Sequence, residues 1–244
     1  MHSKIYIIIS LILFMLQGCL KSKIVSIVDP QVLAIPIKEN QDALIDLKNQ
    51  KIIAFGDSPE IPNNTDYTKI RLTVYNKLVE AQNMLPQGLR FCLYEVYRSL
   101  ALQEMIFNKR YNEVKKEYPY YNSDKIFLES IRLVSPVVNL DGSHNIPPHS
   151  TGGAIDIYLL DEQGNVVDMG IHPKDWIKDI EGLLSKTDSN IISQKAKYYR
   201  KIMSNVLIKS GFVNYPTEYW HWSYGDRYWA YHNNKEYAFY GSIK

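Results

Sequence analysis

The stretch that decides how this chain folds runs Pro148-His149-Ser150-Thr151-Gly152-Gly153-Ala154-Ile155-Asp156. Because side chains alternate between the two faces of a strand, Gly152, Ala154 and Asp156 would share one face. Ile155, Ile157 and Leu159 would share the other, apolar face and pack into the core. A core strand normally fills both faces with bulk, and strand glycines mark close approach of a ligand or another backbone. The pattern therefore predicts a strand over 153–160. One face of this strand would carry small side chains and a single carboxylate, that of Asp156.

A second informative stretch, Thr217-Glu218-Tyr219-Trp220-His221-Trp222, lies further along the chain. Glu218 and His221 are three positions apart, so on a regular strand they would face opposite ways. They can share a site only if Glu218 lies in the turn before the strand, and Pro216 favours such a turn. Trp220 and Trp222 would flank His221 as an apolar wall that limits water.

Together the two stretches supply His149, Asp156 and His221, which are residue types that bind zinc, with Glu218 as a nearby proton acceptor. A catalytic zinc site needs three protein ligands, an open position and a base. Each piece alone is weak evidence, because a single histidine beside a tryptophan is more often structural and a single glutamate is more often a surface charge. The joint pattern predicts a metal centre in which three distant side chains meet.

The rest of the chain alternates helical and strand patterns in mixed order, which predicts an α+β fold. Apolar spacing predicts a helix over 68–85, and Ser99 could cap another. The further expected elements are strands over 89–97 and 219–224, helices over 124–133 and 192–210, short extended pieces at 32–35 and 51–55, and an irregular region over 164–189.

The bulk composition excludes few classes of protein. The 244 residues suit one compact domain or two small ones, and a hydrophobic fraction of 45% is ordinary for a globular protein. The formal charge is +2, with no stretch of gathered basic residues, so we expect no nucleic-acid partner.

The N-terminus has the features of a secretory signal. Lys4 precedes an apolar run that is too short to span a membrane comfortably, followed by Leu16-Gln17-Gly18-Cys19. This ending resembles a bacterial lipobox, so we expect residues 1–18 to be a signal peptide and Cys19 to be lipidated; an ordinary cleaved signal or an uncleaved anchor are the alternatives. Either way the chain would be exported to the periplasm or cell envelope.

The remaining boundaries and the second cysteine follow from this interpretation. We expect an N-terminal extension over 20–65 and a catalytic domain over 66–244. With Cys19 lipidated, Cys92 has no partner for an intramolecular disulfide. Its apolar surroundings favour a buried hydrophobe over a catalytic thiol.

The motifs in these two stretches resemble those of a known family of enzymes. The pattern His149-x-x-Gly152-x-Ala154-x-Asp156, followed by Glu218-x-x-His221, is similar to the zinc D-alanyl-D-alanine dipeptidases, which include the enzyme of vancomycin resistance. The similarity covers roughly residues 68–231 and extends to the segments Glu95-Val96-Tyr97-Arg98 with Gln103, 211–216 and 223–230. It implies the hedgehog-type fold, a single domain with a central, mostly antiparallel sheet flanked by helices.

Carried over by position, the resemblance implies one zinc ion per chain held by His149, Asp156 and His221. It implies Glu218 as general base and acid, and Arg98 as the cation facing the scissile carbonyl. A salt bridge between Arg98 and its neighbour Glu95 is the structural alternative.

The sequence also departs from the family pattern. Pro147 stands where many relatives have serine, and proline offers neither a hydroxyl nor an N–H. Glu95 replaces a shorter aspartate. Asp168 or Glu95 could contact the substrate ammonium, and a solvated loop carboxylate is an equal alternative for Asp168. His144 and His172 are expected to be non-ligands.

The expected function is therefore zinc-dependent hydrolysis of D-Ala-D-Ala, or of a related small dipeptide from cell-wall peptides. A D,D- or L,D-carboxypeptidase acting on longer peptidoglycan stems is the alternative within enzymes. A zinc-containing binding module without catalysis is the alternative of another class. We expect a small peptide substrate as partner, and membrane contact only through a lipid anchor.

Overall fold

The computed structural model describes residues 24–59 and 64–243. The expected signal peptide and Cys19, the residue expected to be lipidated, lie outside the described residues. In the part of the chain that is described, helices are too short or too polar to cross a membrane.

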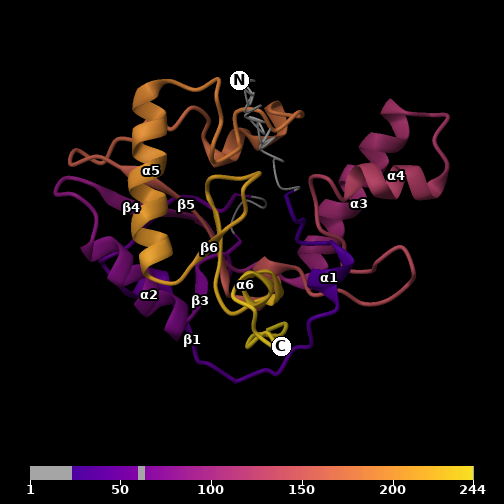
Figure 1. Cartoon of the computed structure of the whole chain (residues 1–244), viewed down its shortest axis with the longest axis horizontal. Helices are drawn as coiled ribbons and strands as arrows, with labels where there is room; N and C mark the ends of the chain where they lie inside the picture. The colour runs from indigo at the N-terminus through magenta and orange to yellow at the C-terminus, as the bar shows by residue number, and fades with distance from the viewer. Residues whose placement is uncertain (1–23, 60–63, 244) are drawn as a thin grey trace, which may run out of the picture.

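The chain forms short strands and helices in mixed order (Figure 1). The elements are α1 (Pro30–Leu33), β1 (Leu44–Asp46), β2 (Ala54–Phe55), β3 (Lys69–Arg71), α2 (Leu72–Asn83), β4 (Arg90–Glu95), α3 (Leu100–Glu117), α4 (Ser123–Ser130), β5 (Ala154–Leu160), α5 (Gln194–Lys209), β6 (Val213–Asn214), β7 (His221–Ser223) and α6 (Arg227–His232), with 3-10 helices at Leu47–Asn49, Pro148–Thr151 and Pro173–Lys178.

The main sheet has five strands in the order β2-β4-β5-β7-β6. Only the β2–β4 pair is parallel; β4–β5, β5–β7 and β6–β7 are antiparallel. A second, two-stranded sheet pairs β1 with β3. This architecture confirms the predicted α+β fold with a central, mostly antiparallel sheet. It also shows that the N-terminal segment contributes an edge strand, β2, to the main sheet.

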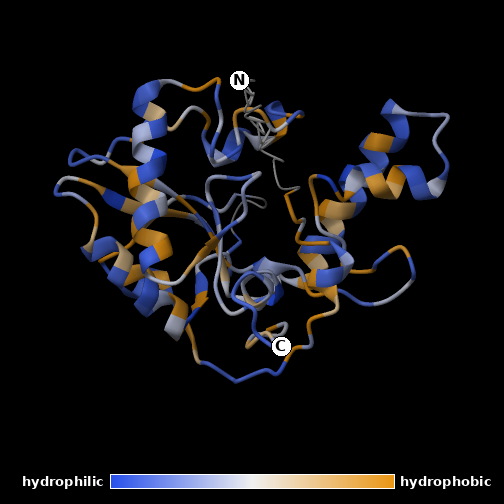
Figure 2. Ribbon diagram, viewed as in Figure 1, coloured by the Kyte–Doolittle hydropathy of each residue, from blue (hydrophilic) through white to orange (hydrophobic). Residues whose placement is uncertain are grey.

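The apolar face of β5 packs into the core as predicted. Ile155, Ile157 and Leu159 are fully buried in the largest hydrophobic cluster, which also takes in the apolar stripes of α2 and α5. Both helices lie side by side against this part of the molecule (Figure 1), and each shows one apolar and one polar side (Figure 2). The opposite face of β5 is thereby left for the polar side chains of the site.

Helix starts follow local capping chemistry. The Ser99 hydroxyl accepts a hydrogen bond from the Leu102 amide at 3.2 Å, which confirms the predicted cap of α3. Ser193 caps α5 in the same way. The predicted helix over 68–85 begins later, at Leu72, because 69–71 pairs with β1 as a strand.

The prediction of an extended piece at 32–35 is wrong. Residues Pro30–Leu33 form the short helix α1. Pro30 occupies its first turn, where the fixed φ of proline suits a helix and the missing N–H costs no bond. The strand predicted over 219–224 is shorter than expected, because residues 216–217 and 219–220 form turns before β7.

Gly153, at the start of the predicted strand, lies in close contact with other parts of the chain. A Cβ at Gly153 would lie 2.5 Å from the Tyr224 carbonyl oxygen and 2.8 Å from Cδ2 of Tyr240. The sequence allowed two explanations for a glycine in this strand, close approach of a ligand or of another backbone. The structure shows that another backbone approaches Gly153.

Replacing Gly153 with alanine should destabilise the protein by about 1–3 kcal/mol, because the clash is with backbone that cannot move aside. Urea unfolding should show a lower midpoint with an unchanged slope. Gly241→Ala is the matched control, since its nearest contact would be an ordinary 3.4 Å. Equal midpoints for the two variants would contradict the steric explanation.

Candidate active site

Three neighbouring strands bring the carboxylates and one imidazole of the site into a single row. Glu95 on β4 pairs with Asp156 on β5, and Asp156 pairs with His221 on β7. A register shift between Leu93 and Glu95 sets this alignment. Because directly paired residues project from the same face of a sheet, the three side chains converge at one end of it.

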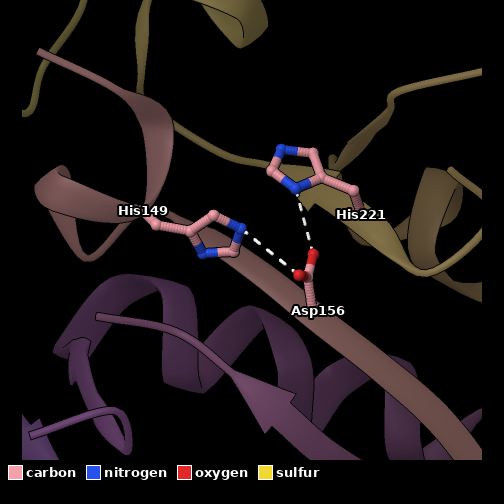
Figure 3. A group of neighbouring side chains, drawn as sticks. All are labelled: His149, Asp156 and His221. Atoms are coloured by element: carbon pink, nitrogen blue, oxygen red, sulfur yellow. Dashed lines mark hydrogen bonds and ion pairs between the residues drawn. The ribbon is translucent and has the colours of Figure 1, made fainter. Parts of the chain in front are cut away.

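His149 reaches the same point from a different element. It lies in the 3-10 helix Pro148–Thr151, which ends at Gly152 in the left-handed conformation, with φ of 70°. That turn reverses the chain into β5, so His149 and Asp156 face each other (Figure 3).

The described residues contain one group of side chains able to hold a metal ion: His149, Asp156 and His221, all buried. One ligand atom from each lies within 4.8 Å of the others. Nε2 of His149 is 3.4 Å from Asp156 Oδ2, and Nδ1 of His221 is 3.0 Å from Asp156 Oδ1. The structure thus brings together the three residues that the sequence singled out.

Hydrogen bonding fixes which nitrogen of His149 is available. Its Nδ1 is 2.8 Å from the Val96 carbonyl oxygen. A carbonyl can only accept, so Nδ1 carries the proton and the lone pair lies on Nε2, the atom that faces Asp156. A ligating histidine is commonly held in this way by a backbone carbonyl behind it. The arrangement fits a divalent cation such as zinc.

The charges of the cluster also suit a cation. Burial opposes ionisation of Asp156, yet the two imidazoles beside it hold the pKa of its carboxyl well below the usual range. Burial lowers the pKa of His149, but Asp156 outweighs this effect and leaves the pKa of the imidazole above its ordinary value. Protonation of His149 therefore competes with a cation for the same ligand atom.

This competition predicts how zinc binding depends on pH. As the pH falls, zinc must displace a proton from His149, and the raised pKa of this imidazole makes that competition begin above about pH 6.5. The Asp156 carboxyl stays ionised over this range. Titrations of metal-free protein with zinc should show affinity falling toward about tenfold per pH unit for each proton displaced. An affinity that stays constant below neutral pH would contradict the assignment.

Glu218 lies in the turn immediately before β7, as predicted. Its backbone carbonyl accepts a hydrogen bond from the His221 amide at 3.1 Å, which ties the glutamate to the site. Packing of protein atoms around the half-buried side chain raises the pKa of the Glu218 carboxyl, and the charge of Asp156 raises it further against the opposing imidazoles and Arg98. A carboxyl with a raised pKa is suited to accept and return protons.

Arg98 and its neighbours form a rigid polar unit at the edge of the site. Its guanidinium donates to both carboxylate oxygens of Glu95, with Nε 3.2 Å from Oε1. Nη1 donates to Oε1 of Gln103 at 3.0 Å, and the amide of Gln103 donates to the Ser135 carbonyl. The salt bridge with Glu95 that the sequence offered as an alternative is present, and Arg98 also lines the site's pocket.

One pocket is lined by all five predicted site residues, namely Arg98, His149, Asp156, Glu218 and His221. Several of its other lining residues were not predicted from the sequence. Its lining is Ile27, Tyr94, Arg98, Gln103, Ile106, Leu133, Val134, Ser135, Pro147, Pro148, His149, Asp156, Pro173, Trp176, Tyr215, Glu218, Trp220 and His221. Trp176 comes from the irregular 164–189 region, whose sequence has no periodic signal that would place it here. Ile27 comes from the N-terminal segment, far away in sequence.

Four further expectations have clear outcomes in the structure. Trp220 lines the pocket, but the prediction that Trp222 does so is wrong, because it is fully buried in the core. Asp168 is exposed and its side chain accepts from the Gly170 amide, outside the pocket lining. His144 and His172 lie outside the metal-binding group. Cys92 is buried, as expected.

Two imidazoles and a carboxylate that meet beside a glutamate in one pocket form the kind of site that metallopeptidases have. The chain belongs to the D-Ala-D-Ala dipeptidase family of peptidases, whose sequence profile matches residues 70–239. It is 24% identical to the D-alanyl-D-alanine dipeptidase of Synechocystis sp. over 246 residues, covering 87% of this chain and 96% of the relative.

Comparison with solved structures finds VanYB in complex with D-Alanine-D-Alanine, at 17% identity, with 82% of this chain and 93% of that one covered and a TM-score of 0.41. It also finds the LdcB LD-carboxypeptidase, at 16% identity, with coverage of 81% and 76% and a TM-score of 0.41.

Proposed function

We propose that this metallopeptidase uses one zinc ion, held by His149, Asp156 and His221, to hydrolyse D-Ala-D-Ala or a related small dipeptide from cell-wall peptides. The observation that supports it most is the convergence of three ligand atoms within 4.8 Å in the pocket that also contains Glu218 and Arg98. The name of the Synechocystis relative supports the choice of substrate.

A zinc ion bound there would act as a Lewis acid and would lower the pKa of a coordinated water to about 7. Residues of the chain itself would transfer the protons and stabilise the developing charge. Glu218 would accept a proton from the attacking water at its carboxylate and pass it to the leaving amine. Its raised pKa favours this role, because a base works best when its pKa is close to the operating pH.

Arg98 would stabilise the negative charge that develops on the scissile carbonyl oxygen. Its guanidinium is held on two sides by Glu95 and Gln103, so it needs little reorganisation when that charge appears. Removing a preorganised donor of this kind costs about 3 kcal/mol of transition-state stabilisation.

The walls of the pocket support a short substrate. Ile27, Pro147 and Pro148 are rigid or apolar and offer no side-chain hydrogen bonds, while Trp176 and Trp220 limit access of water. The N-terminal segment thereby contributes a wall to the pocket, as an enzyme restricted to dipeptides requires.

A dipeptide panel tests this proposal. Purified protein loaded with zinc should hydrolyse D-Ala-D-Ala in preference to L,L and L,D dipeptides, and a chelator should abolish turnover until zinc is restored. Turnover that persists in full after the metal has been removed would rule the mechanism out. Zinc-loaded protein that turns over no dipeptide and no stem peptide would favour the non-catalytic binding module instead.

We also propose that the protein is exported and anchored to a membrane by a lipid. The signal-like N-terminus and Cys19 support export and lipid anchoring in the periplasm or cell envelope, with a role in wall recycling or nutrition. Labelling with a fatty acid probe should depend on Cys19. Protein recovered only in the cytoplasm, without label, would overturn this part.

A further inference from the structure

A buried arginine binds the segment that forms part of the wall of the catalytic pocket. Arg200 belongs to helix α5 (Figure 1), is only 1% exposed and lies outside the pocket lining. Its Nε donates to the Met169 carbonyl oxygen at 2.8 Å, its Nη2 to the Leu184 oxygen at 2.8 Å and its Nη1 to the Lys186 oxygen. One guanidinium therefore joins two parts of the irregular region 164–189 that are well separated in sequence.

These partners are unusual for a buried cation. In the described part of the chain, the guanidinium of Arg200 hydrogen-bonds to carbonyls and to no carboxylate. Asp168 and Asp179 are close enough to favour its charge, but their carboxylates accept hydrogen bonds from backbone amides instead. Burial lowers the pKa of Arg200 to about 10, so the group stays charged at neutral pH. An apolar side chain would stabilise the fold at least as well, which points to a role connected with the site.

The guanidinium of Arg200 also contacts Tyr219, the residue that follows Glu218. Its Cζ lies over the ring of Tyr219, 4.0 Å from the ring centroid. The Tyr219 hydroxyl donates to the Ile171 carbonyl oxygen at 2.6 Å, and its backbone amide donates to the Ser185 oxygen at 2.9 Å. Tyr219 is therefore held at its ring, its hydroxyl and its backbone by Arg200 and by the same region that Arg200 binds.

Both parts that Arg200 connects belong to the catalytic pocket. Pro173 and Trp176 line the pocket from the irregular region, and Glu218 lines it from the turn before β7. The His221 amide donates to the Glu218 carbonyl oxygen at 3.1 Å, so this turn is short and closely bonded. A displacement of Tyr219 would therefore move Glu218 relative to the wall that contains Trp176.

We propose that Arg200 is a positioning residue, which acts through Tyr219 to hold the turn of Glu218 against the wall that carries Trp176. Glu218 is thereby kept in the place where it accepts and returns protons. This inference rests on the proposed function and adds a residue to its mechanism. A lysine would keep the charge of Arg200 but could not bind three carbonyls in fixed directions while lying flat on an aromatic ring.

Hydrogen exchange tests the positioning without relying on activity. In the full chain carrying Arg200→Lys, the amides of Tyr219 and His221 should exchange about tenfold faster than in the unmodified chain, because the turn loses the support of fixed hydrogen bonds. Tyr219→Phe removes only the hydroxyl that binds Ile171, so it should give a smaller increase at the same amides. Amides of the central strand β4 should exchange as before in both variants.

Kinetics in two backgrounds tests whether this positioning acts on Glu218. Arg200→Lys should lower kcat on D-Ala-D-Ala by about 10–100-fold, since a misplacement of about 1 Å costs about 100-fold in rate. Added to Glu218→Gln, it should lower the residual kcat by less than about twofold, because the group that it positions is already lost. Zinc content should stay at one ion per chain, since the three proposed ligand residues are unchanged.

Arg90→Lys is the matched control. Arg90 is exposed on β4, outside the pocket lining, and its guanidinium also binds backbone carbonyls, those of Lys51 and Ile52. The variant makes the same chemical change as Arg200→Lys at a place with no connection to Glu218. It should leave kcat and the exchange of the Tyr219 amide unchanged.

An equal loss of kcat with and without Glu218→Gln would overturn the proposal, since Arg200 would then act independently of the base. So would unchanged exchange of the Tyr219 and His221 amides in both variants, whether or not the enzyme is active. If Arg200→Lys fails to fold, Tyr219→Phe serves for both measurements. An unmodified chain that does not turn over D-Ala-D-Ala would count against the proposed function alone, because the exchange measurement does not depend on turnover.

Discussion

Replacing Glu218 with glutamine should reduce kcat by about 10²–10⁴-fold while the protein keeps its zinc. Glutamine keeps the shape of the side chain but cannot accept the proton from the attacking water or return it to the leaving amine. The three proposed ligand atoms belong to other residues, so metal content should stay at one ion per chain. Steady-state kinetics on D-Ala-D-Ala and metal analysis of the same preparation measure the two quantities.

Glu104→Gln is the matched control for that experiment. Glu104 is an exposed residue of α3 outside the pocket, and its replacement makes the same change in charge. It should leave both kcat and metal content unchanged. A Glu218→Gln protein that retains more than a tenth of normal kcat would remove Glu218 from the proton-transfer role. One that loses its zinc would instead make Glu218 a ligand.

The parts of the site predictable from sequence are those in which local geometry leaves few choices. Alternation along 153–160 determined that Ile155 and Asp156 point to opposite faces. Pro216 and the three-residue spacing between Glu218 and His221 required a turn before the strand. Both arguments use only neighbouring residues, and both hold in the structure.

The features that could not be predicted depend on contacts between distant segments. Gly153 looked equally compatible with a ligand and with a backbone, and only the position of Tyr224 decides between them. Trp222 has the same local sequence context as Trp220, yet pairing of β7 between β5 and β6 turns it into the core. Ile27 reaches the pocket through the path of the N-terminal segment, for which the sequence contains no periodic signal.

The row formed by Glu95, Asp156 and His221 connects the metal site to the arginine that would stabilise the transition state. Glu95 is fully buried and directs Arg98, while its cross-strand neighbour Asp156 lies between the two imidazoles. A register slip of one residue would turn Asp156 away from both. The bulge near Glu95 and the fully buried Ile155 and Ile157 hold this register, so the core positions the catalytic groups.

Replacing His221 with alanine should abolish both zinc binding and turnover. Loss of residues that merely orient a metal ligand already weakens binding by about 10–100-fold, so loss of a ligand should cost more. His221 also gives Asp156 its 3.0 Å contact, and without it the buried carboxylate would retain only His149 as an imidazole partner. Atomic absorption after dialysis should find protein without zinc, and excess zinc should restore little activity.

His144→Ala is the control, because His144 is exposed and lies outside the metal-binding group. It should bind zinc and turn over substrate as the unmodified chain does. Comparison with Glu218→Gln then separates the two roles, since one variant should lose chemistry alone and the other should lose the metal as well. If His221→Ala kept a full zinc ion, the cluster of His149, Asp156 and His221 would not be the metal site, because two remaining side chains cannot supply the three ligands that a catalytic zinc requires.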